Sequence, residues 1–296
     1  MTRRGLAAAL IGTVLVISCL AAACSPVTLL NLVAPRGAAL SQHSYGAGPR
    51  HMLDVYAPAA AGSHASAAAG APVVVFFYGG GWESGNRRMY RFIGATLAAH
   101  GIVAVIPDYR VYPEVRFPDF IKDGAAAVAW AEAHAAEYGG DPARLFLMGH
   151  SAGAQIAALL ALDRHYLREA KADPENIAGV IGLAGPYDFL PLKSERLRDI
   201  FGTTDTDRHS QPIDYVTADA PPMLLASASD DVTVYPRNSR ALAARLRAAG
   251  RRVTELYYPH VGHRTLIAAF AGPLSFLAPV QRDTLRFIAR TPGGGG

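Results

Sequence analysis

Residues 145–153 read Leu-Phe-Leu-Met-Gly-His-Ser-Ala-Gly, and the only serine of this stretch is Ser151. An apolar run precedes the first glycine, and an apolar helical pattern from Ala154 to Leu162 follows the last one. This order predicts a strand, a sharp turn and a helix, with Ser151 at the apex. Glycine suits both flanks, because strand and helix approach so closely there that a Cβ atom would have no room. An ordinary strand-to-helix turn is the plain alternative.

The five residues from Gly149 to Gly153 also fit the G-x-S-x-G pattern of a nucleophile elbow. In such an elbow the backbone of the serine is strained, and the turn exposes its side-chain oxygen. The same turn directs the backbone N–H of Ala152 toward the reaction centre. Ser151 is therefore the candidate nucleophile. His150 occupies the variable position of the pattern, and we expect a structural or pocket-lining role for it.

A second motif lies upstream, where the apolar run Val73 to Phe77 leads into Tyr-Gly-Gly-Gly-Trp at residues 78–82. A buried strand that ends in three glycines leaves backbone N–H groups uncovered. Acyl transfer places negative charge on a carbonyl oxygen, and each backbone donor aimed at it contributes roughly 2.7–4 kcal/mol. The loop predicts an oxyanion hole. A flexible loop is the alternative, and a phosphate cradle is disfavoured because no Lys-Ser/Thr pair follows the glycines.

Together these motifs resemble the α/β-hydrolase superfamily, specifically the bacterial carboxylesterases related to hormone-sensitive lipase. Two short segments, Pro-Asp-Tyr-Arg at 107–110 and Gly-Gly-Asp-Pro at 139–142, are similar to the same family. The resemblance extends from about Tyr45 to Ile288. It implies an oxyanion hole formed by the N–H groups of Gly80, Gly81 and Ala152.

This chain departs from that family at one position of the glycine loop. Tyr78 stands where the family usually has a histidine that braces the loop. Because a tyrosine hydroxyl can also form hydrogen bonds, we expect Tyr78 to brace the loop in the same way.

Strand patterns alternate with helical patterns through the rest of the chain. This alternation predicts an α/β fold, the α/β-hydrolase fold, with a mostly parallel central sheet flanked by helices on both faces. The segment Leu190 to Ala220 is long and mixed, and we expect it to cover the site. The expected strands are Leu53–Tyr56, Val73–Phe77, Ile102–Ile106, Leu145–Met148, Ala178–Leu183, Met223–Ala228 and Val253–Tyr258, and the expected helices include 87–99, 118–137, 154–162 and 237–249.

A nucleophilic serine needs a base, and the base needs an acid. In α/β-hydrolases the acid follows the serine and precedes the histidine in the chain. Two aspartates, Asp230 and Asp231, follow the strand that ends at Ala228. The family spacing G-x-x-D-x-x-V, with Val234 at its end, favours Asp231, and Asp230 is the fallback. Both could also be turn or capping residues.

Two histidines, His260 and His263, follow the strand that ends at Tyr258. His263 comes after a glycine and opens a helical stretch, similar to the family's terminal Gly-His, so we favour it as the base. His260 lies closer to the strand end, where a loop role is expected. The resemblance requires no metal or organic cofactor, and no H-E-x-x-H spacing is present.

The composition of the chain suits one α/β domain rather than two, with 296 residues and 51% apolar content. The formal net charge is +4, and the arginines are scattered without a basic run. This pattern favours a solvated basic surface and argues against nucleic-acid binding.

The N-terminus has the form of an export signal. Arg3 and Arg4 precede an uncharged apolar stretch from Gly5 to Ala23, which ends in small residues before Cys24. We predict a signal peptide over residues 1–24 that resembles a bacterial lipoprotein leader, with lipidation of Cys24 and membrane association. Cys19 is a less favoured cleavage site, and an uncleaved anchor is the rival interpretation.

The leader also sets the expected domain boundaries. We expect a tether over residues 25–44, a catalytic domain over 45–292 and a flexible tail over 293–296. Both cysteines lie in the leader, so the body can form no internal disulfide and has no thiol nucleophile.

These features predict a serine esterase that acts on a small-molecule carboxylic ester. An arylformamidase or an esterase for feruloyl or acetyl groups of plant polysaccharides is the nearest alternative, because the same triad serves all of them. A non-catalytic binding protein with the same fold is a second alternative.

Overall fold

The structure is a computed structural model that describes residues 26–59, 70–202 and 208–293. The predicted leader with Cys19 and Cys24, most of the low-complexity stretch after Ala57, and residues 294–296 of the predicted tail lie outside this range.

The described residues form one eight-stranded sheet in the order β1-β2-β4-β3-β5-β6-β7-β8. Strand β2 pairs antiparallel with β1 and with β4, and every pair from β4 to β8 is parallel. The carboxyl ends of β3, β5, β7 and β8 therefore meet at one edge of the sheet. The strands are β1 (Ala39–Ser44), β2 (Met52–Ala57), β3 (Ala71–Phe77), β4 (Val103–Pro107), β5 (Gly140–His150), β6 (Ile177–Leu183), β7 (Met223–Ala228) and β8 (Val253–Tyr258).

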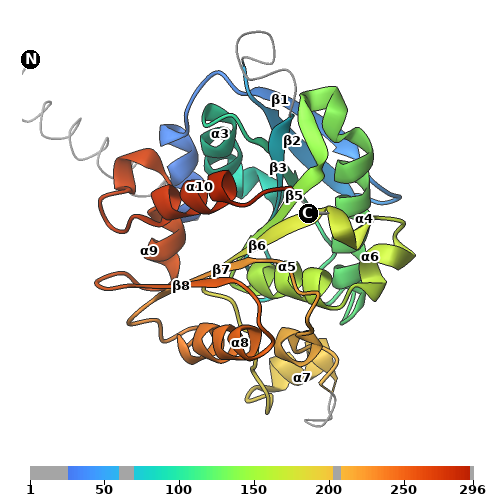
Figure 1. Cartoon of the computed structure of the whole chain (residues 1–296), viewed down its shortest axis with the longest axis vertical. Coiled ribbons are helices and arrows are strands. Elements are labelled where there is room, and N and C mark those ends of the chain that lie inside the picture. Colours follow the sequence, from blue (N-terminus) through green and yellow to red (C-terminus); the bar gives the residue numbers. More distant parts are fainter. Residues whose placement is uncertain (1–25, 60–69, 203–207, 294–296) are drawn as a thin grey trace, which may run out of the picture.

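Helices cover both faces of this sheet. In Figure 1, α3 and α10 lie on one side, and α5 and α8 lie on the other. This arrangement confirms the predicted α/β-hydrolase fold. The α-helices are α2 (Pro26–Leu29), α3 (Arg91–Ala99), α4 (Asp119–His134), α5 (Ala152–Leu162), α6 (His165–Glu169), α7 (Glu195–Phe201), α8 (Arg237–Ala248), α9 (His263–Ala268) and α10 (Val280–Arg290), and the 3₁₀ turns are η1 (Leu30–Val33), η2 (Arg87–Tyr90), η3 (Ala135–Tyr138), η4 (Pro174–Asn176), η5 (Pro212–Tyr215) and η6 (Gly272–Leu274).

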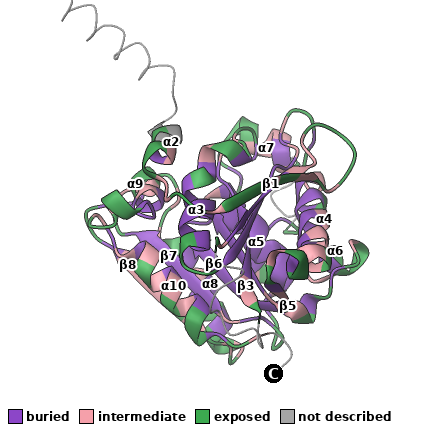
Figure 2. Cartoon of the chain, turned by 90° about the horizontal axis from the view of Figure 1, so that it is seen from above, coloured by how far each residue is buried: buried purple, intermediate pink, exposed green. Residues whose placement is uncertain are grey.

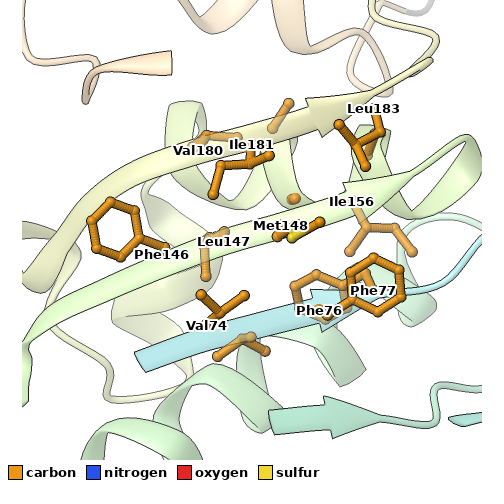
Figure 3. Packing of buried hydrophobic residues seen from close by; sticks show 14 of the residues in the cluster. Val74, Phe76, Phe77, Phe146, Leu147, Met148, Ile156, Val180, Ile181 and Leu183 are labelled. Atoms are coloured by element: carbon orange, nitrogen blue, oxygen red, sulfur yellow. The ribbon is translucent and has the colours of Figure 1, made fainter. Parts of the chain in front are cut away.

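The hydrophobic core is centred on β3, β5, β6 and helix α5. Figure 2 shows buried residues on the central strands, with exposed residues mainly on the outer helices and loops. Every residue of β6 and of α5 is buried, as expected for strands and helices covered on both sides. In Figure 3, Phe76 of β3 lies beside Met148, its register partner on β5, and Phe77 lies toward Ile156 of α5. The strand that leads into Ser151 is therefore held in the buried core of the molecule.

One boundary prediction is wrong. Residues 39–44 fall within the segment that we expected to be a tether, yet they form the edge strand β1. Only alternate side chains of β1 are half-buried, so its sequence lacks a strong apolar pattern. Backbone pairing with β2 holds the strand, and Gln42 donates to the Asp54 carboxylate at 2.9 Å. The folded body thus begins before Tyr45.

Candidate active site

The turn between β5 and α5 has the strained geometry of an elbow. Ser151 has φ 55° and ψ −125°, in the left-handed half of backbone space that residues with a Cβ rarely adopt. A Cβ added at Gly149 would lie 2.1 Å from the carbonyl oxygen of Gly153. A Cβ added at Gly153 would lie 2.0 Å from the carbonyl oxygen of Phe77. The backbone N–H of Ser151 donates to the Leu183 carbonyl at 2.9 Å. Neighbouring strands therefore hold the strain in place.

The three predicted triad residues form one chain of hydrogen bonds. Nε2 of His263 lies 2.9 Å from Oγ of Ser151, and Nδ1 of His263 lies 2.8 Å from Oδ2 of Asp231. Since an ionised carboxylate only accepts, Nδ1–H donates to Asp231, which leaves Nε2 to accept the proton of the serine hydroxyl. This is the arrangement in which a histidine can act as a base toward Ser151.

Asp231 is set up as an ionised acceptor. Its second oxygen, Oδ1, accepts from the backbone N–H groups of Thr233 and Val234, each at 2.9 Å. Burial acts to raise the pKa of Asp231, but the hydrogen bonds from His263 and from these two N–H groups lower that pKa below its usual value. The neighbouring Asp230 is exposed.

His260, the less favoured candidate for the base, is also exposed. It sits in a turn with φ 62°, directly after β8. Of the two histidines that follow this strand, His263 is the one that meets Ser151 and Asp231.

The glycine loop after β3 is closed into a tight turn. Gly80 has φ 142°, and a Cβ there would lie 2.1 Å from the Ser84 carbonyl oxygen. The Gly80 carbonyl accepts from the N–H groups of Glu83 at 3.1 Å and Ser84 at 3.0 Å. The N–H groups of Gly80, Gly81 and Ala152 have no acceptor among the residues that the structure describes. Their predicted role as oxyanion donors is compatible with this geometry and stays a prediction.

Tyr78 braces this loop as expected. Its hydroxyl donates to Oδ1 of Asp108 at 3.1 Å, and its ring stacks on Tyr109 with centroids 4.6 Å apart. The Tyr109 hydroxyl in turn donates to the Tyr78 carbonyl at 2.7 Å. Burial and the Asp108 carboxylate raise the pKa of Tyr78, so its hydroxyl stays protonated and can donate.

The sequence did not reveal the ion pairs beneath this brace. The guanidinium of Arg87 pairs with Asp108 and, at 2.6 Å, with Asp54. The backbone N–H of Arg87 also donates to Asp108 at 2.6 Å. All three side chains are buried, and they join β2, the chain just after β4, and η2. Asp108 belongs to the Pro-Asp-Tyr-Arg segment at residues 107–110, and this resemblance was the one feature of the sequence that pointed to these ion pairs.

Phe201, in the segment from Leu190 to Ala220, and Phe189 just before it pack on Trp82 of the glycine loop, in line with the expectation that this segment covers the site. Phe201 meets the Trp82 ring edge-on at 4.8 Å, and Phe189 stacks on it at 5.8 Å. Trp82 donates through Nε1 to Gln155 of α5 at 3.1 Å, and Gln155 donates to the Ser210 carbonyl at 2.9 Å. An aromatic wall therefore stands beside the glycine loop.

The described residues offer no cluster of metal ligands and no helix that could span a membrane. No group of three or more His, Cys, Asp or Glu side chains in residues 26–59, 70–202 and 208–293 is arranged to hold a metal ion. Over the same ranges, no helix has both the length and the apolar character needed to cross a membrane.

Comparisons with known proteins agree with this site. The chain is 33% identical over 232 residues to esterase LipC of Mycobacterium tuberculosis. This alignment covers 70% of this chain and 58% of LipC. It is 29% identical over 244 residues to a probable isoprenylcysteine alpha-carbonyl methylesterase, ICMEL1, of Arabidopsis thaliana. This alignment covers 75% of this chain and 50% of that protein. The chain thus spans about half the length of these relatives.

Solved structures match over most of the chain. Butyrate-bound esterase 2 of Thermogutta terrifontis superimposes with a TM-score of 0.67 at 26% identity, over 88% of this chain and 97% of that one. A carbohydrate esterase from gut microbiota has a TM-score of 0.71 at 20% identity, over 86% and 98%, and supports the fold alone. The family model BD-FAE matches residues 53–246, which is more than half of the chain. The chain therefore belongs to the BD-FAE family, within the α/β-hydrolase fold.

Proposed function

We propose that this protein is a serine carboxylesterase that hydrolyses small-molecule carboxylic esters through an acyl-enzyme. The observation that carries the proposal is the unbroken chain of hydrogen bonds from Ser151 through His263 to Asp231. The esterase names of the similar proteins support it.

In the first half of the reaction, Oγ of Ser151 attacks the ester carbonyl while Nε2 of His263 takes the hydroxyl proton. The carbonyl oxygen becomes an oxyanion, and the N–H groups of Gly80, Gly81 and Ala152 donate to it. Asp231 stabilises the imidazolium that forms on His263. The ester C–O bond then breaks, and the leaving alcohol takes the proton from Nε2.

In the second half, His263 accepts a proton from water as that water attacks the acyl group on Ser151. The same donors hold the second oxyanion. The acyl–Oγ bond breaks, the carboxylic acid leaves, and Oγ regains its proton from His263. One ester and one water give one acid and one alcohol, and these residues carry every proton transfer.

The test is hydrolysis of p-nitrophenyl acetate and butyrate by the full chain, beside the Ser151→Ala variant. We expect activity in the parent and a loss of several orders of magnitude in the variant. Ser275→Ala, at an exposed serine directly after the η6 turn, is the matched control and should keep parent activity. Faster cleavage of N-formylkynurenine than of any ester would replace the esterase proposal with a formamidase. A folded parent that fluorophosphonates do not label would favour a binding protein.

We also propose that the protein is exported and held at a bacterial membrane through a lipidated Cys24. The supporting observations are the leader pattern and the apolar surface that begins just after it. Leu29, Leu32 and Val33 are exposed, with Leu32 at 77%. Acyl chains on Cys24 would bring these side chains to the bilayer surface.

Membrane fractionation of two cysteine variants tests this location. Cys24→Ser should move the protein out of the membrane fraction, whereas Cys19→Ser should leave it there. The reverse result would place the acylated cysteine at position 19. Membrane retention of both variants would favour an uncleaved anchor.

A further inference from the structure

His150, the residue before Ser151 in the elbow, is buried beside the catalytic histidine and takes no part in the proposed mechanism. Its Nε2 lies 3.0 Å from the backbone carbonyl oxygen of His263, and the two imidazole rings are 4.8 Å apart at 40°. A carbonyl oxygen only accepts, so Nε2 of His150 carries the proton and donates it.

The surroundings of the other ring nitrogen, Nδ1, keep the imidazole of His150 neutral. Nδ1 is buried with no partner among the described residues, and it faces Gly79, where an added Cβ would lie 3.1 Å from it. Burial, followed by the positive charge that His263 can carry, lowers the pKa of His150 to about 3. His150 therefore stays neutral and does not repel the imidazolium that forms on His263.

The hydrogen bond from His150 joins two elements that differ in length and position in the fold. His150 is the last residue of β5, whose carboxyl half is buried in the core. His263 is the first residue of α9, a helix of six residues that follows the half-exposed turn after β8. The base thus lies at the start of a short helix, and the hydrogen bond from His150 ties its backbone to a buried strand of the core.

We propose that His150 is a positioning residue, whose neutral Nε2–H holds the backbone of His263 so that its imidazole stays on Oγ of Ser151. His150 contacts neither substrate nor reacting atoms. The inference rests on the proposed esterase function and extends it to a residue that the reaction does not consume.

Two substitutions in the full chain separate the hydrogen bond from the ring. His150→Phe keeps an aromatic ring and removes the donor, whereas His150→Gln keeps an N–H donor at a similar reach. With p-nitrophenyl butyrate, we expect His150→Phe to lower kcat roughly a hundredfold, as a small misplacement of a catalytic group does, with KM within about threefold. His150→Gln should recover at least a tenth of the parent kcat.

His134→Phe is the matched control. His134 also bonds a backbone carbonyl, that of Trp130 at 2.8 Å, and stacks on an aromatic ring at 4.3 Å, but it lies on α4. Its kcat should equal that of the parent. Melting temperatures of all variants show whether each one is folded.

Parent-like kcat in His150→Phe would overturn the inference, and so would equal losses in the Phe and Gln variants. A crystal structure of His150→Phe gives a readout that needs no substrate, because the distance from Nε2 of His263 to Oγ of Ser151 should exceed 3.5 Å. An unchanged distance would also overturn the inference. If the parent itself hydrolyses no ester while this distance lengthens as expected, only the proposed function fails.

Discussion

Gly153 of α5 lies directly against the carbonyl oxygen of Phe77 at the end of β3, so closely that an added Cβ would stand 2.0 Å from that oxygen. This contact joins the helix that follows Ser151 to the strand that leads into the glycine loop. Ser151 and the glycine loop are therefore placed relative to each other by a backbone approach that only glycine permits.

Replacing Gly153 should damage the fold as well as the site. Gly153→Ala pushes a methyl group into backbone that cannot rotate away, and we expect a loss of about 3 kcal/mol or more in the free energy of unfolding. Urea unfolding measures this. Gly272→Ala, where nothing lies within 4 Å of an added Cβ, should change stability little. Equal stability of the two variants would contradict the steric argument.

The two neighbouring aspartates after β7 should differ sharply in their effect on catalysis. Asp231→Asn removes the acceptor that sets the tautomer of His263, and we expect kcat to fall about a thousandfold or more. Asp230→Asn changes an exposed side chain and should leave kcat within about twofold of the parent. Ester hydrolysis by both variants decides the point, and a larger loss at Asp230 would reverse the assignment.

The tyrosine brace should contribute to stability through its hydroxyl. Tyr78→Phe removes a buried donor to Asp108, and we expect the free energy of unfolding to fall by about 1–3 kcal/mol. Because the brace supports the glycine loop, kcat should fall as well. Tyr235→Phe, at a tyrosine that is 53% exposed, is the control and should be neutral in both measurements. A neutral Tyr78→Phe would show that stacking on Tyr109 alone holds the loop.

His150 should make the protein sensitive to acid. Its folded pKa is about 3 and its ordinary value is 6.5, so between these values the unfolded chain binds a proton that the folded protein excludes. Stability therefore rises with pH across this window and falls as the pH drops from 6.5 toward 3, by up to about 1.4 kcal/mol per pH unit. The lowered pKa of Asp231 matters only at lower pH, because its stabilisation is lost as the pH falls below about 3.8.

Urea unfolding of the parent and of His150→Gln between pH 6 and pH 4 tests this slope. The variant lacks the excluded proton, so its stability should depend less steeply on pH. Parallel curves for the two proteins would mean that His150 takes up its proton in the folded state.

Local sequence was enough to predict Ser151 and the glycine loop. A strand, a turn and a helix lie next to one another in the chain, and the glycines report a close approach of the backbone. Chain order and family spacing then pointed to Asp231 and His263, and in the structure His263 bonds both Ser151 and Asp231. Strand β1 could not be found this way, since backbone pairing rather than an apolar pattern holds it.

By itself the sequence determined most of the elements of this protein, β1 excepted, and the chemistry that they can carry, because apolar period, glycine position and residue type act over a few neighbouring residues. Only the tertiary structure decided which distant groups meet. The Arg87 ion pairs beneath the loop and the hydrogen bond from His150 to His263 join residues 21 or more positions apart. Such contacts depend on the order and register of the strands in the sheet, and no local pattern encodes them.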